Sequence, residues 1–210
     1  MPAPIHGKRV AEALTALCGP GLSVTELVTD QASHPGLYAF HTSASTWREL
    51  GLGNPPDDRP LYVGKAENTL ASRDIEGHFG MRKRGAQSPT GSSTLRRSLA
   101  ALLAPTRGYH GIPRNPAKPG DFSNFGLSVA HDDDLSAWMC RRLHLALRPH
   151  PAPAQLDAIE TDVLRELSPP VNLAKVVTVT PWRYHRARGH ARSSRRKLEH
   201  GGPGPERFRR

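Results

Sequence analysis

Cysteine and long apolar runs are both scarce in this sequence. The chain of 210 residues has two cysteines, Cys18 and Cys140, and no Cys-x-x-Cys pair, which argues against a structural zinc site. Both cysteines fall in helix-like segments, so we expect small buried thiols in a reducing compartment rather than a disulfide. No apolar run approaches the ~20 residues that span a bilayer, and the first residues lack the apolar segment of a signal peptide. The sequence therefore predicts a cytoplasmic protein with no membrane partner.

Aromatic residues are also few, whereas glycine and proline are plentiful. Aromatics make up 6% of the chain, against 19 Gly and 20 Pro, a composition that predicts long loops around a modest core. The length suits one main domain with an appendage. We expect a helical segment packed on the core at 1–33, the main domain at 34–180, and a basic flexible C-terminal tail at 181–210.

Positive charge is concentrated in the tail. Residues 183–210 carry ten Lys and Arg against two Glu, so they supply +8 of the formal net charge of +10. Such a tail is either a flexible solubilising segment or an arm that neutralises nucleic-acid phosphates and releases their counterions. A second basic group, in the turn-rich loop 80–91, is either a solvated loop or a phosphate clamp. The candidate nucleic-acid contacts are Arg82, Lys83, Arg84, Arg96, Arg97, Arg183, Arg186 and Arg188.

One short stretch, RPLYVGKAEN at 59–68, organises the middle of the sequence. Its apolar residues alternate with Tyr62 and Gly64, as in a short buried strand. A glycine there permits close approach of a backbone or a ligand, and Lys65 adds a cation. A phenol, a gap and a cation within four residues can hold a phosphate. A tyrosine in a strand is equally an ordinary core residue, so this stretch alone leaves both interpretations open.

Periodicity and capping residues predict an alternation of helices and strands. Serine and threonine at 92–94 cap a helix, and the acidic run 132–134 suits a helix start better than a metal cluster. We expect helices at 8–18, 46–52, 67–79, 95–103, 135–147 and 156–167, extended segments at 36–41, 61–64, 122–129 and 171–180, and an undecided strand or helix at 22–28.

The helix at 156–167 carries a carboxylate on its apolar side. Glu160 falls within or at the border of the face formed by Leu156, Ile159 and Val163. A carboxylate there is costly unless it is paired or binds a metal, so Glu160 is either an edge ion pair or a metal ligand. The prolines that follow the helix favour an extended chain, which leaves Asn172 near the sheet.

In their order along the chain, these segments resemble the GIY-YIG nuclease superfamily. The resemblance rests on Gly36-Leu-Tyr38, on LYVGKA at 61–66, on an arginine in the next helix, and on Glu160 followed by Pro169-Pro-Val-Asn172. It covers roughly residues 34–174. It implies a small α/β fold, with a three-stranded antiparallel sheet flanked by helices, to which this chain adds loop-rich insertions and its basic tail.

Carried over by motif position, the resemblance implies a catalytic set. Tyr38 and Tyr62 would be paired on neighbouring strands with Lys65 beside them, and Glu160 would bind Mg²⁺ or Mn²⁺. A tyrosine can deprotonate a water only where nearby cations, such as Lys65 and the metal, favour its own deprotonated form. Tyr38 is the candidate for that role or for orienting the water. The candidate catalytic residues are Tyr38, Tyr62, Lys65, Arg73, His78, Glu160 and Asn172.

The chain departs from the family pattern in three places. The segment between the two tyrosines is longer than in most members, which predicts an insertion, with Trp47 and Pro55-Pro56, that contacts DNA or a partner. Arg73 comes one residue late, and the spacing of His78 is also off by one. His78 is therefore either an additional residue of the site or a cap at the end of a helix.

The resemblance implies a metal-dependent endonuclease that hydrolyses phosphodiester bonds in DNA. Two alternatives stay open: a catalytically silent member that binds nucleic acid, and a basic protein associated with RNA or the ribosome, which the tail favours. The sequence shows no zinc finger, helix-turn-helix or helical hairpin, so we expect cutting that is selective for DNA structure or only weakly specific, or a protein partner that supplies the specificity. The oligomeric state stays open.

Overall fold

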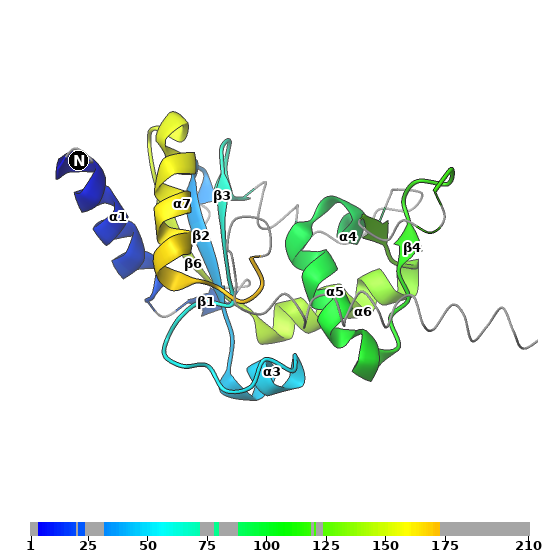
Figure 1. The fold of residues 1–210 in the computed structure, drawn as a ribbon. Coiled ribbons are helices and arrows are strands. Elements are labelled where there is room, and N and C mark those ends of the chain that lie inside the picture. Colours follow the sequence, from blue (N-terminus) through cyan, green and yellow to red (C-terminus); the bar gives the residue numbers. More distant parts are fainter. Residues whose placement is uncertain are drawn as a thin grey trace, which may run out of the picture.

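The computed structural model describes residues 4–19, 21–23, 32–71, 78–79, 88–118, 120 and 124–172. A sheet with helices on both sides forms one part of the fold, and a mainly helical insert lies beside it (Figure 1). The elements are α1 (Pro4–Leu17), β1 (Leu22–Ser23), β2 (Gly36–His41), α3 (Ala44–Glu49), β3 (Tyr62–Ala66), α4 (Pro89–Ser92), α5 (Thr94–Arg107), β4 (Ile112–Pro113), β5 (Phe125–Gly126), α6 (Val129–Arg142), β6 (His144–Pro149), the 3-10 turn η3 (Pro153–Gln155) and α7 (Leu156–Leu167).

The main sheet has four antiparallel strands in the order β1-β6-β2-β3. The expected antiparallel sheet flanked by helices is confirmed, with one strand more than the three that were expected. The register places Tyr38 of β2 opposite Gly64 of β3, and Phe40 opposite Tyr62. Because strand side chains alternate between faces, Tyr38, Phe40 and Tyr62 project from the same face of the sheet.

Helices cover both faces of the sheet. On one face, α1 and α7 enclose an apolar cluster with Leu37, Ala39 and Val63 of the strands. The amphipathic pattern of 156–167 accounts for this contact, since α7 turns Ile159 and Val163 inward. The opposite face, which carries the tyrosines, belongs to a second cluster that also contains apolar residues of α3, α5 and α6.

The largest difference from the sequence prediction concerns β6. The helix expected at 135–147 ends at Arg142, and His144–Pro149 forms a strand between β1 and β2. Apolar residues at 143, 145 and 147 alternate like a strand but also extend the apolar side of the preceding helix. Residues 144–149 form a strand because all of them pair with β2. The local sequence alone does not indicate that pairing.

The insert between β3 and β6 contains α4, α5 and α6. The expected cap of α5 is confirmed: Ser93 Oγ accepts a hydrogen bond from the backbone N–H of Arg96 at 3.1 Å. Gly108, in the left-handed region with a φ of 66°, ends the helix. Of the extended segment expected at 122–129, residues 122 and 123 lie outside the described residues, and Phe125–Gly126 forms β5, which pairs with β4 in a separate two-stranded sheet. Ser128 caps α6 directly afterwards.

Three side chains have an exposure opposite to the prediction. Cys18 and Cys140 are free and exposed rather than buried. For Cys140 the reason is that α6 turns other residues, such as Trp138 and Met139, into the core. Trp47 of α3 is only 4% exposed. It packs in the core on the tyrosine side of the sheet and is not available to contact DNA or a partner.

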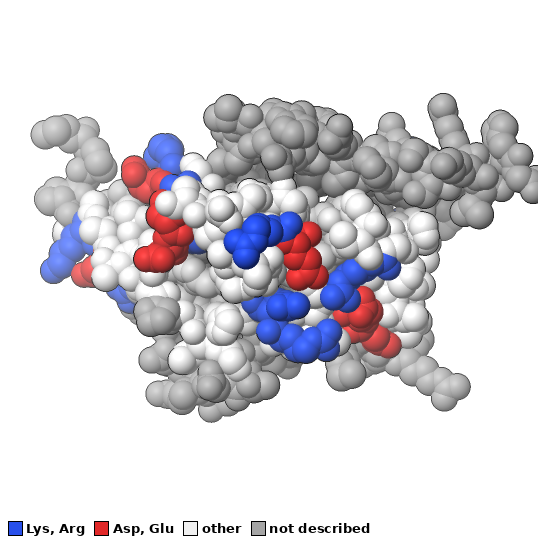
Figure 2. All heavy atoms as spheres, turned by 90° about the horizontal axis from the view of Figure 1, so that it is seen from below, with Lys and Arg blue, Asp and Glu red and all other residues white. Residues whose placement is uncertain are grey.

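Charged side chains of both signs occur side by side on the face drawn in Figure 2. Among the described residues, Arg107 lies 2.9 Å from Asp134 and 3.7 Å from Glu49. Arg142 lies 3.9 Å from the same glutamate. Positive charge at the ends of α5 and α6 is thus locally balanced. None of the helices in the described ranges has the length and apolar character required to cross a membrane.

Candidate active site

Tyr38 lies at the centre of the candidate site, on an interior strand. Its side chain is fully buried, and its ring lies over Gly64 of the neighbouring strand. A Cβ atom at position 64 would come within 2.5 Å of Cζ and Oη of Tyr38. Real Cβ contacts do not occur at that distance, so glycine is required for the tyrosine to occupy this position. The gap noted in the sequence after Tyr62 is therefore filled by a second phenol.

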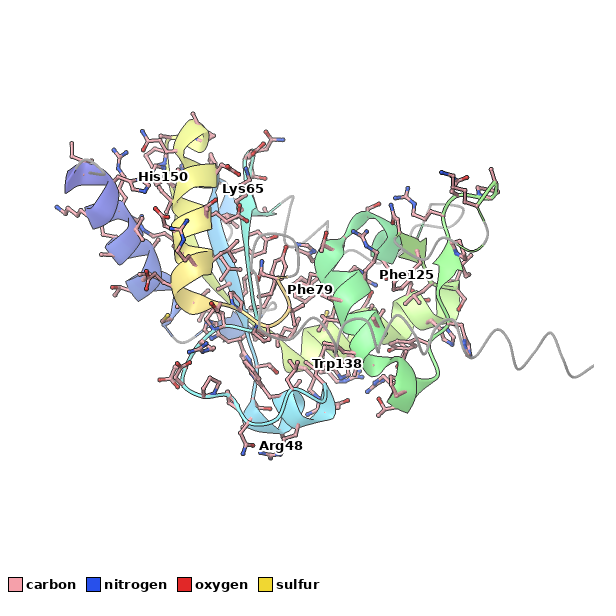
Figure 3. All side chains as sticks on the ribbon, viewed as in Figure 1. Arg48, Lys65, Phe79, Phe125, Trp138 and His150 are labelled. Carbon is pink, nitrogen blue, oxygen red and sulfur yellow. The ribbon has the colours of Figure 1, made fainter. Side chains whose placement is uncertain are left out.

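Tyr62 joins Tyr38 in a cluster of rings. The two ring centroids lie 6.2 Å apart, with an angle of 35° between the planes. The ring centroid of Phe40 lies 5.6 Å from that of Tyr38 and 5.5 Å from that of Phe79, and both contacts are edge-on. Figure 3 shows Phe79 between the sheet and the helical insert. The expected pairing of the tyrosines on adjacent strands is thus present in the structure.

His78 completes this cluster and is almost fully buried. Its Nε2 lies 2.8 Å from the hydroxyl of Tyr38, and its Nδ1 lies 2.8 Å from Oγ of Ser93. The imidazole therefore contacts the candidate tyrosine directly, and its membership of the site stays a prediction. The connecting residues 72–77, which include Arg73, lie outside the described residues.

Arg96 supports His78 from the insert and is a correction to the predicted nucleic-acid contacts. Its side chain is 0% exposed, so it cannot meet a phosphate. It donates to the backbone carbonyl of His78 at 2.7 Å and lies 3.4 Å from a carboxylate oxygen of Asp132. Burial lowers the pKa of the guanidinium, and the neighbouring Asp132 opposes that shift. The acidic residue at the start of α6 therefore holds an arginine.

Asn172, in the segment after α7, forms hydrogen bonds to the outer edge of β3. Its Oδ1 accepts from the backbone N–H of Val63 at 2.8 Å, and its Nδ2 donates to the carbonyl of Val63 at 2.6 Å. The backbone N–H of Val171 also donates to the carbonyl of Leu61 at 3.2 Å. The amide thus replaces a missing strand partner, one residue away from Tyr62.

Lys65 does not lie beside the tyrosines as expected. Strand alternation turns it to the α7 side of the sheet, where it lies 3.1 Å from Asp157 and 2.6 Å from Glu67 (Figure 3). The hydrogen bond to Glu67 and the contact with Asp157 raise the pKa of the ammonium. Its position gives no support to a role in stabilising a deprotonated Tyr38.

Glu160 is buried in α7, at 7% exposure, on the helix side expected from the sequence. α7 contacts β3, the strand that carries Tyr62, but packs on the face of the sheet opposite to the tyrosines. In the part of the chain that the structure describes, no three His, Cys, Asp or Glu residues cluster around a common point. Mg²⁺ is nonetheless commonly held by one or two carboxylates together with waters and substrate phosphates. A single buried carboxylate fits that mode of binding.

Of the remaining basic candidates, the structure describes Arg97. Arg97 is partly buried and donates to the carbonyl of Gly91 at 2.8 Å, which leaves it near the surface of the insert. The others lie outside the described residues: Arg73, Arg82, Lys83, Arg84, Arg183, Arg186 and Arg188.

Among the described residues, Ser93 makes a polar contact with the candidate site that the sequence interpretation did not assign to it. The sequence signal was present, because Ser93 was expected to cap a helix, but a cap gives no indication of what its hydroxyl faces. Only the tertiary packing of the chain brings Ser93 to His78, 15 positions earlier in the sequence.

Comparison with protein families matches residues 56–190 to the GIY-YIG catalytic domain. The match covers more than half of the 210 residues, and the chain belongs to this family. The matched range contains Tyr62, His78, Glu160 and Asn172. Tyr38 lies before it and is joined to it by the pairing of β2 with β3. Searches of curated proteins and of solved structures gave no match.

Proposed function

We propose that this protein is a metal-dependent endonuclease that hydrolyses phosphodiester bonds in DNA. Family membership supports a nuclease. The single observation that carries the proposal is the contact of Tyr38 with both Tyr62 and His78, at the face of the sheet. A phenol hydrogen-bonded to an imidazole, with a second phenol packed beside it, forms a group that can accept and relay a proton, which phosphodiester hydrolysis requires.

In this proposal Tyr38 first releases its phenolic proton to solvent, and the resulting phenolate accepts a proton from the attacking water. The water oxygen bonds to phosphorus, the bond from phosphorus to the 3′-oxygen breaks, and the departing oxygen takes a proton from solvent. Tyr62 orients the water or shares the role of base. Arg73 holds the phosphate and offsets its growing negative charge, as guanidinium groups do in other phosphoryl-transfer sites.

Glu160 would hold the divalent cation, Mg²⁺ or Mn²⁺. When bound, the cation neutralises charge on the phosphate and on the leaving oxygen. The role of the chain is to fix the position of the carboxylate, which α7 does by burying Glu160 on its inward side. Asn172 supports the site through its two hydrogen bonds to the backbone of β3.

The test is nicking of supercoiled plasmid in Mg²⁺, Mn²⁺ or EDTA. Glu160→Gln keeps the size of the side chain and removes its charge, and we expect it to lower the cleavage rate ~100-fold or more while binding is retained. Glu166→Gln is the matched control, because Glu166 is an exposed residue of the same helix. Arg73→Ala should also lose cleavage. Wild-type rates in Glu160→Gln would show that the metal assignment is wrong.

A separate test concerns the basic tail, which we propose binds nucleic-acid phosphates. Replacing Arg183, Arg186 and Arg188 together by Gln should flatten the slope of log K against log salt by about 3, because each phosphate that is no longer neutralised reduces the slope by roughly 0.9. Binding is measured by fluorescence anisotropy on duplex DNA and on RNA of equal length. An unchanged slope would mean that these arginines do not bind phosphates. Stronger binding to RNA, without cleavage, would favour the RNA-associated alternative.

A further inference from the structure

Ser93 makes two hydrogen bonds through one hydroxyl group. Oγ accepts from the backbone N–H of Arg96 at 3.1 Å and lies 2.8 Å from Nδ1 of His78. Ser93 is 2% exposed, so water has little access to it. The residue that begins α5 is thus also in direct contact with the imidazole of the candidate active site.

The balance of donors and acceptors determines which atom carries each proton. Oγ of Ser93 already accepts from Arg96, and its own O–H needs an acceptor. Among the described residues, the acceptor within reach is Nδ1 of His78. If Nδ1 donated instead, the buried O–H of Ser93 would be left without an acceptor, at a cost that destabilises that arrangement. Nδ1 therefore accepts, and the imidazole proton resides on Nε2.

We propose that Ser93 is a positioning residue that fixes His78 in its Nε2–H tautomer and so makes the hydroxyl oxygen of Tyr38 a hydrogen-bond acceptor. Nε2 lies 2.8 Å from that oxygen and donates to it. A donated hydrogen bond stabilises negative charge on the oxygen that accepts it. Once Tyr38 has released its own phenolic proton to solvent, this hydrogen bond stabilises the phenolate, which can then take a proton from the attacking water, whereas His78 stays neutral and acts as the donor.

The helical insert holds this arrangement rigid. The Arg96 side chain donates to the carbonyl of His78 at 2.7 Å, to Oγ of Ser136 at 3.0 Å and to the carbonyl of Asp132 at 3.0 Å. The backbone of His78, the start of α5 and the first turns of α6 are therefore connected through one buried guanidinium. The insert thus supplies the groups that orient the imidazole.

The tautomer is measured directly by ¹⁵N NMR of the histidine side chains, in which the protonated and bare nitrogens of a neutral imidazole resonate far apart. His78→Gln identifies the signal. We expect Nε2 protonated and Nδ1 bare in the wild type, and a loss of that preference in Ser93→Gly. Glycine is nearly as good an N-cap as serine, so this variant removes the hydroxyl and largely keeps the cap. Ser93→Thr restores both.

The matched control is Ser128→Gly, which alters the equivalent cap of α6, another 14-residue helix, without touching His78. Ser93→Gly should lower the plasmid cleavage rate about tenfold or more with little change in substrate affinity, as part of the ~10²–10⁴-fold effect of a positioned acid–base group. Ser128→Gly should cleave as the wild type does. This activity arm rests on the proposed function, but the NMR arm does not.

Three results would overturn the inference: a proton on Nδ1 in the wild type, a tautomer unchanged in Ser93→Gly, or equal cleavage rates in Ser93→Gly and Ser128→Gly when the wild type is active. An inactive wild type with the expected tautomer would instead count against the proposed function and leave the role of Ser93 supported.

Discussion

Asn172 offers the sharpest test of how the edge of the sheet is held beside the site. The N–H and C=O of Val63 face the outer edge of β3, and both are satisfied by the side-chain amide of Asn172. Val63 is fully buried and Asn172 nearly so. Truncation to alanine therefore leaves two buried backbone groups without partners.

The expected loss of stability follows from the two backbone groups of Val63 that lose their partners. Each unsatisfied buried polar group costs about 1–3 kcal/mol, and partial entry of water lowers the sum. We expect Asn172→Ala to reduce the free energy of unfolding by about 2–4 kcal/mol. With a urea m-value of about 2 kcal/mol/M, the midpoint of urea unfolding would fall by roughly 1–2 M. Circular dichroism in a urea titration measures this shift.

Asn172→Asp separates the two hydrogen bonds. A charged carboxylate still accepts from the N–H of Val63. Its second oxygen, however, faces the carbonyl of Val63, which in the wild type accepts from Nδ2 of Asn172 at 2.6 Å. Burial and that facing oxygen would raise the pKa of the introduced carboxyl in the folded state. Because the folded-state pKa is raised, the loss in free energy of unfolding is largest at pH values above that pKa, including neutral pH. The loss shrinks as the pH falls toward the unfolded-state pKa of ~3.9.

Asn54→Ala is the control, because Asn54 is exposed and accepts one exposed hydrogen bond, from Arg48. It should change the stability by no more than about 0.5 kcal/mol. A shift for Asn172→Ala as small as that of Asn54→Ala would refute the argument that the amide substitutes for a strand partner. An Asn172→Asp deficit that is independent of pH would refute the assignment of Nδ2 as the donor.

Two further predictions test the insert by urea unfolding. Arg96→Met should lower the free energy of unfolding by about 3–5 kcal/mol, because it leaves the carboxylate of Asp132 buried without its cation. Arg97→Ala should lower it by about 1 kcal/mol or less. Equal losses would contradict the distinction between these neighbours. A hydrogen bond from Tyr109 lowers the pKa of the Asp134 carboxyl, so Asp134→Asn should lose about 0.5 kcal/mol at pH 7, discounted because that side chain is 44% exposed. A lowered folded-state pKa makes this contribution present above pH ~3.9 and absent once pH falls through the folded value, and a difference that persists in acid would show that charge is not its cause.

Local patterns were sufficient for several elements of this fold. The alternation at 36–41 predicts β2 with its observed bounds, Gly36–His41. The apolar periodicity of 156–167 predicts α7 and the burial of Glu160. The serine before 94 predicts the cap of α5. In each case the information lies within a few residues, because strand alternation, helix periodicity and capping are local properties.

Other features depend on partners far away in the sequence. β6 is a strand because β1 and β2 pair with it, although its apolar residues also fit a continued helix. Arg96 looks like a surface cation in the sequence, but the packing of α5 on α6 encloses it with Asp132. Lys65 follows Tyr62 closely, yet strand alternation and α7 turn it to the other face.

The sequence by itself determined the residue types of the candidate site and their order, since a family pattern is a property of the chain. The contacts among those residues were decided by tertiary structure alone. Gly64 makes room for Tyr38 only because β2 and β3 pair in this register. Ser93 reaches His78 only because the insert folds back on the sheet. A residue type fixes which hydrogen bonds are chemically available, whereas the fold brings together the atoms that form them.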